Sequence, residues 1–141
     1  AASDVYKRQV EAGGLRALGA LLDRPDDVLL HLLHAMLYNL ASDSAPRLRL
    51  LSKFLDPRKV EAVVEARETG ASVDGRVSAN AVLAWLAMED DTLQALVTTR
   101  VPAAELAEAL EGAEFDPRCV AASGDTLEAI THALTAYLRS L

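Results

Sequence analysis

The chain has 141 residues, of which 51% are hydrophobic and 25% charged, so it is long enough for one domain with a core and is not a disordered tail. Its formal net charge of −7 argues against nucleic acid as a partner, because phosphate binding needs a basic face, and favours basic partners instead. Aromatic residues make up only 4%, so the core must consist of Leu, Val and Ala. Leu and Ala are strong helix formers, and their abundance predicts an all-α protein.

Neither a membrane span nor a signal peptide is visible in the apolar pattern. The longest apolar run, residues 28–33, is interrupted by His31, and no run approaches the roughly 20 residues that a membrane span needs. The single cysteine, Cys119, cannot form an internal disulfide, which suits a reducing compartment. We therefore expect an intracellular protein, cytoplasmic or nuclear, that has no membrane partner.

Both ends of the sequence predict a fragment of a longer protein. Residues 4–9, DVYKRQ, resemble the translation of a transposon end used to build sequencing libraries, so residues 1–9 are interpreted as a non-native or disordered leader. The alternative is a genuine short helix over residues 5–12. At the other end, residues 137–141 continue a helical pattern without a Gly or Pro stop.

Helical periodicity dominates the first half of the chain, and no stretch shows the sustained alternation of a strand. A short helix is expected over residues 15–22, after the break at 13–14. Residues 28–41 are apolar nearly all round, as in a helix sandwiched between neighbours. A turn at 42–46 precedes a short helix at 48–55, and Asp56 and Pro57 begin the next helix, which ends near 69–70.

The second half continues in the same way. After a break at 72–75, residues 77–86 predict a second long apolar helix, which the acidic residues 89–91 terminate. A short helix follows over 93–100, and another from Pro102 to the region of Gly112. Residues 127–138 predict the last helix.

The predicted helices recur in groups of three: a short helix, a medium helix, and a long helix that is apolar. Aligning the ends of the three long helices at Leu40, Leu86 and Leu138 gives spacings of 46 (40 to 86) and 52 (86 to 138) residues. Repeats of two or three helices at roughly 40–47 residues are typical of armadillo and HEAT arrays. We therefore predict a repeat domain over 10–141, divided near 10–43, 44–90 and 91–141, with an insertion around 111–125.

Two segments carry a resemblance to armadillo repeats. Residues 10–22, VEAGGLRALGALL, resemble the junction of the first and second helices of such a repeat, and residues 35–42, AMLYNLAS, resemble the end of its third helix. The third repeat is similar through residues 94–97 and 102–110, and the middle repeat in pattern only. The resemblance implies a right-handed α-solenoid, armadillo- or HEAT-like, in which the third helices line a concave groove.

In the armadillo family that groove binds extended peptides or partner proteins without catalysis. An Asn near the end of the third helix holds the ligand backbone in peptide-binding members, and Asn39 matches that position. An amide suits this role because it offers both a donor and an acceptor. Trp85 and Tyr137 occupy the equivalent positions in the later repeats. Ala35 stands where importin-α-type members carry a Trp, so their ladder for basic side chains is absent.

Each candidate groove residue has a simpler structural alternative. Asn39 could cap its helix, and Trp85 and Tyr137 could pack between repeats. His31 and His34, three residues apart on one helix, could present two metal ligands, but a metal site needs more ligands than these. We interpret both histidines as core or groove residues, and His31 joins the candidate partner-binding set.

No nucleophile, general base, metal set or cofactor motif stands out, so we expect no catalytic residues and no cofactor. The function predicted is a scaffold for a protein or peptide partner. The alternatives are the recognition arm of a larger enzyme, such as a ubiquitin ligase or kinase with its catalytic domain elsewhere, and a structural spacer. Since repeats are buried only by their neighbours and no polar cap is evident, we expect the isolated chain to be marginally stable and to self-associate.

Overall fold

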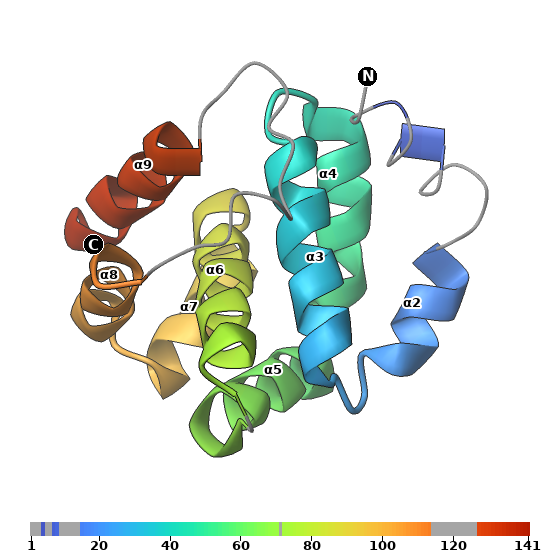
Figure 1. Cartoon of the computed structure of the whole chain (residues 1–141), viewed down its shortest axis with the longest axis horizontal. Helices are drawn as coiled ribbons and strands as arrows, with labels where there is room; N and C mark the ends of the chain where they lie inside the picture. The colour runs from blue at the N-terminus through green and yellow to red at the C-terminus, as the bar shows by residue number, and fades with distance from the viewer. Residues whose placement is uncertain (1–3, 5–6, 9–14, 71, 114–126) are drawn as a thin grey trace.

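The computed structural model describes residues 4, 7–8, 15–70, 72–113 and 127–141. Within these ranges the chain is helical and has no strand, which confirms the all-α prediction (Figure 1). The elements are α2 (Leu15–Leu21), α3 (Asp27–Asn39), α4 (Ser44–Leu51), the 3-10 helix η2 (Ser52–Leu55), α5 (Pro57–Thr69), α6 (Val73–Glu89), α7 (Asp91–Arg100), α8 (Ala103–Glu111) and α9 (Leu127–Arg139).

The long helices α3 and α6 form the centre of the molecule (Figure 1). Helix α6 packs against α3, α5, α7, α8 and α9, and every residue from 78 to 87 is buried. In α3, residues 33–39 are all buried. The sequence predicted such a helix between neighbours for residues 28–41 from their apolar character, and the burial of 33–39 agrees with it, whereas Val28 and Leu32 near the start of α3 are exposed.

Helices α3, α6 and α9 lie in chain order, with α3 packed against α6 and α6 against α9 (Figure 1). Leu40, Leu86 and Leu138, the residues aligned above, are all buried in the core. Between them, α4, η2 and α5 connect α3 to α6, and α7 and α8 connect α6 to α9. None of the helices in the described ranges has the length and apolar character needed to cross a membrane.

Acidic N-caps begin several helices where the sequence predicted a start. The carboxylate of Asp26 accepts a hydrogen bond from Leu29 N at 2.8 Å, and that of Asp90 accepts one from Leu93 N at 3.0 Å. Asp56 accepts from Arg58 N at 3.0 Å just before Pro57, the first residue of α5. Each carboxylate satisfies an amide that the first helical turn leaves unpaired.

Two predicted boundaries are wrong, both at helix starts. Residues 42–46 were expected to be a turn, but α4 begins at Ser44 and holds Pro46 in its first turn, where a missing N–H costs nothing. Residues 72–75 were expected to be a break, but α6 begins at Val73. There Ser72 is the N-cap, and its hydroxyl accepts from Gly75 N at 2.9 Å.

Part of the leader and most of the predicted insertion lie outside the described residues. Asp4, Lys7 and Arg8 are helical, and Lys7 Nζ lies 2.6 Å from Asp43 Oδ2. The remaining leader positions, residues 10–14 of the first armadillo-like segment, and Cys119 with residues 114–126 are not described.

Gly70 is required by a close backbone approach at the end of α5. A Cβ at this position would overlap the carbonyl oxygen of Ala66, whereas a Cβ on Gly19 in α2 would meet only Lys53 Cδ at 4.0 Å. Gly70→Ala is therefore expected to lower the free energy of unfolding by about 1–3 kcal/mol through overpacking. Gly19→Ala should raise it by about 0.5–1 kcal/mol through helix propensity. Urea unfolding of the two variants measures both, and equal effects would contradict the assignment.

Candidate functional site

Asn39 ends α3 and is buried, with 1% of its surface exposed. Its Nδ2 donates to Ala35 O, one turn earlier in the same helix, at 2.8 Å. Its Oδ1 is buried and has no hydrogen-bond partner among the described residues. The Asn39 amide group therefore donates a hydrogen bond to its own helix, and its oxygen accepts none from the described residues.

Trp85 lies near the C-terminal end of α6, where it packs in the core and also lines a pocket. Its ring meets that of Tyr38 edge-on, with centroids 6.0 Å apart, and only 3% of the residue is exposed. A pocket of about 220 Å³ opens beside it. Met88 of α6 and four residues of α9 supply most of the apolar lining: Ala129, Ile130, Ala133 and Leu134. Trp85 therefore packs against Tyr38 and also lines this pocket.

Arg47 of α4 closes the polar side of this pocket. Its guanidinium carbon lies 5.3 Å from the centre of the Trp85 ring, a cation–π distance. Its Nε is 2.8 Å from Glu89 Oε1, and both side chains are only 13% exposed. Its Nη1 donates to the carbonyls of Leu40 at 3.3 Å and Ala41 at 2.5 Å, so one side chain binds the ends of both α3 and α6.

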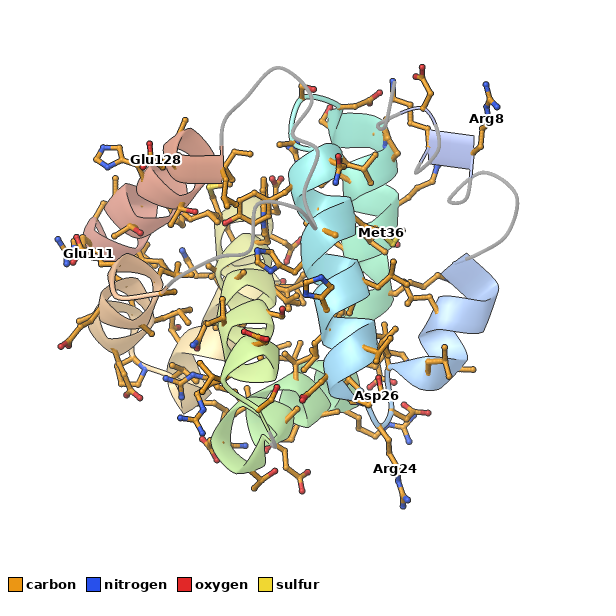
Figure 2. All side chains as sticks on the ribbon, viewed as in Figure 1. Arg8, Arg24, Asp26, Met36, Glu111 and Glu128 are labelled. Carbon is orange, nitrogen blue, oxygen red and sulfur yellow. The ribbon has the colours of Figure 1, made fainter. Side chains whose placement is uncertain are left out.

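The polar interface between the three long helices begins at His34. His34 Nδ1 lies 3.4 Å from Ser78 Oγ of α6, and its ring meets Tyr38 edge-on at 4.8 Å. Tyr38 reaches Thr131 Oγ1 of α9 at 3.1 Å, and since that hydroxyl donates to Leu127 O, the Tyr38 phenol is the donor. Helix α3 therefore contacts both α6 and α9 through hydrogen-bonding side chains. Met36 lies on the other side of α3, turned away from α6 (Figure 2).

Burial changes the acidity of two of these groups. It lowers the pKa of His34 from 6.5 to about 4, with His31 adding a smaller repulsion, so the imidazole is neutral near pH 7. Burial also raises the pKa of Tyr38, to about 12. Neither group is charged at neutral pH, as expected between apolar helices.

The four predicted groove residues do not converge on one point. Tyr137 is half-buried, and its hydroxyl accepts from Gln94 Nε2 of α7 at 2.8 Å. His31 is half-exposed on α3, one turn before His34. The pocket lining includes Trp85 and, among the described residues, does not include Asn39, Tyr137 or His31. Of these four residues, Trp85 is therefore the one that lines this pocket.

Sequence reasoning missed Arg47, Glu89 and the α9 side of the pocket. Glu89 follows Trp85 by four residues, so the helical period places both on one face of α6, and this signal was available. Arg47 reaches the pocket because the chain turns between α3 and α4, and the residues around Arg47 in the sequence do not indicate this position. Within the described ranges, no three His, Cys, Asp or Glu side chains gather as a metal site would require.

The chain was compared with protein-family models, with curated proteins and with solved structures, and none of them matches it.

Proposed function

We propose that this chain is a non-catalytic scaffold for protein interaction, built as a right-handed solenoid of armadillo-type repeats. Its third helices α3, α6 and α9 would hold an extended segment of a partner protein, in the cytoplasm or nucleus. The observation that carries the proposal is the side-by-side packing of α3, α6 and α9 in chain order, each the last helix of one predicted repeat. In repeat proteins, units stacked in this way form extended binding surfaces.

Asn39 supports a role for α3 in contacting the ligand. A buried amide oxygen without a donor costs about 1–3 kcal/mol relative to a satisfied one. The Asn39 Oδ1 is in this state among the described residues. The N–H of a peptide bound along α3 would supply the missing donor, and ordered peptide backbones are commonly recognised in this way.

The proposal is tested by selecting random phage-displayed peptides against the whole chain and mapping the binders by amide chemical shifts. Perturbations confined to α3, α6 and α9 are expected, with α5 as the internal reference. Enrichment of no peptide, or perturbation of α5 without the three third helices, would overturn the scaffold proposal.

Replacing Asn39 separates a ligand contact from a structural role. Asn39→Ala should weaken a selected peptide about tenfold, the effect of one hydrogen bond. The free energy of unfolding should change by less than about 1 kcal/mol, because the one bond lost is to a carbonyl of the same helix. Titration calorimetry and urea unfolding measure the two effects.

Asn80 provides the contrasting case. It is buried in α6, and its Oδ1 accepts a 2.5 Å hydrogen bond from Arg67 Nε of α5. Asn80→Ala should therefore cost stability, about 1–3 kcal/mol, because Arg67 Nε loses its buried acceptor while Nη2 stays bonded to Glu105. If Asn39→Ala is as destabilising as Asn80→Ala and leaves peptide affinity unchanged, Asn39 is structural.

A further inference from the structure

The pocket at the end of α6 has two walls of different chemistry. Trp85 and Met88 of α6, with Ile130, Ala133 and Leu134 of α9, make its wall apolar. Arg47 and Glu89 make the opposite edge polar, and they are already paired with each other. A ligand in this pocket would therefore contact an apolar wall and, beside it, the Arg47–Glu89 ion pair, whose charges cancel.

We propose that this pocket is an anchor site for one bulky apolar side chain of a peptide whose neighbouring residues are basic, with a peptide carbonyl accepting a hydrogen bond from Trp85 Nε1. This inference rests on the proposed scaffold function and names the ligand chemistry at one position of it.

The size of the pocket selects a single side chain. A cavity of about 150 Å³ holds one benzene molecule, whereas pockets for drug-sized ligands measure about 300–1,000 Å³. The volume here is about 220 Å³. A Leu, Met or Phe side chain suits this space, and a nucleotide or other organic cofactor is too large for it.

Trp85 supplies the second observation that points to a ligand. Its Nε1 is buried and has no acceptor among the described residues, while the residue as a whole is 97% buried, being 3% exposed. An indole N–H buried in a protein usually finds a partner. A peptide seated in the adjoining pocket, which Trp85 lines, would supply this acceptor by bringing a backbone carbonyl to Nε1.

The surroundings of the pocket are acidic, which selects the residues flanking the anchor. The α6–α7 junction carries Glu89, Asp90 and Asp91 in succession, and Asp91 is exposed. Glu128 is exposed in the first turn of α9 and directly precedes Ala129, which lines the pocket. Arg47 is engaged by Glu89 and by two carbonyls. Complementary charge steers the partner and sets specificity, so Lys or Arg beside the anchor is favoured.

The test uses Trp85 as its own reporter, because it is the only tryptophan of the chain. Three capped tripeptides are titrated to about 10 mM, a range suited to millimolar affinity: acetyl-Lys-Leu-Arg-amide, acetyl-Lys-Gly-Arg-amide and acetyl-Glu-Leu-Glu-amide. The indole N–H resonance should shift downfield with the first and not with the second. An equal response to the acidic tripeptide would overturn the charge preference, and no response to any would overturn the anchor site.

A matched pair of α9 variants locates the effect. Ala133 and Ala136 are both exposed, but only Ala133 lines the pocket. Ala133→Arg should reduce the affinity for acetyl-Lys-Leu-Arg-amide at least tenfold by filling the recess, while Ala136→Arg leaves it unchanged. Equal affinities in both variants would place binding elsewhere. The phage-display selection tests the scaffold function independently of this pocket. If selected peptides bind along α3 and the Trp85 resonance does not shift, the anchor site is wrong and the scaffold function is not contradicted.

Discussion

Arg47→Met is expected to lower the free energy of unfolding by about 3 kcal/mol, because it leaves the largely buried carboxylate of Glu89 without its counter-charge. The Arg47 and Glu89 side chains are each only 13% exposed, so water cannot fully replace the lost partner. The substitution also removes two hydrogen bonds to the carbonyls that end α3 and the cation over Trp85. Urea unfolding monitored by circular dichroism measures the change.

Arg49 is the control, since it is exposed on the same helix. Arg49→Met should change stability by less than about 0.5 kcal/mol. Replacing Arg47 and Glu89 together by Met should recover much of the loss, because the cost of one unpaired buried charge disappears when the pair is removed. A loss below about 1 kcal/mol for Arg47→Met alone would show that the pair is not needed to join α3 to α6.

The second large effect is acid destabilisation through His34. Its pKa is 6.5 when unfolded and about 4 in the fold, so between these values the unfolded chain binds more protons than the native state. Stability therefore rises with pH in this window and falls as pH drops through it. The full loss is about 3 kcal/mol, of which about 2 kcal/mol is lost between roughly pH 7.5 and pH 5.

His34→Gln should flatten this dependence, since Gln keeps a polar group near Ser78 Oγ and does not titrate. His132 is exposed on α9, so His132→Gln should behave as the unsubstituted chain does. Asp56, whose pKa is held low by its bonds to Arg58, also favours the fold at higher pH, but it is common to all variants. Equal pH slopes for His34→Gln and the unsubstituted chain would contradict the assignment.

Helix content and the order of helices could be predicted from the sequence because apolar spacing and acidic caps are local signals. Asp56 and Pro57 fixed the start of α5, and the nearly all-round apolar character of 28–41 predicted a helix packed between neighbours. The starts of α4 and α6 were missed because Pro46 and Ser72 were taken for breaks. Pro occurs both in turns and in the first turn of a helix, and Ser occurs both in loops and as a helix N-cap. Tertiary packing decides which of these structures forms.

The site was less predictable, because its residues come from three helices. Trp85 was selected by its place in the repeat, and it does line the pocket. Tyr137 was selected by the same alignment, yet its hydroxyl is bound by Gln94 of α7. A repeat alignment assigns a position on a helix but not the rotation of that helix against its neighbours. That rotation depends on long-range contacts such as Tyr38 to Thr131, which no local pattern encodes.

The central place of α6 links binding to the integrity of the whole chain. Because α6 contacts five helices from both halves of the chain, separating any one of them uncovers part of its apolar surface. In a plain linear array, a terminal unit can fray while the rest remains folded. Here such fraying is suppressed, since α3 and α9 are also joined directly through Tyr38 and Thr131. A ligand held against α6 or α9, as proposed, would therefore stabilise the entire molecule, and its binding would raise the global melting temperature rather than order one segment alone.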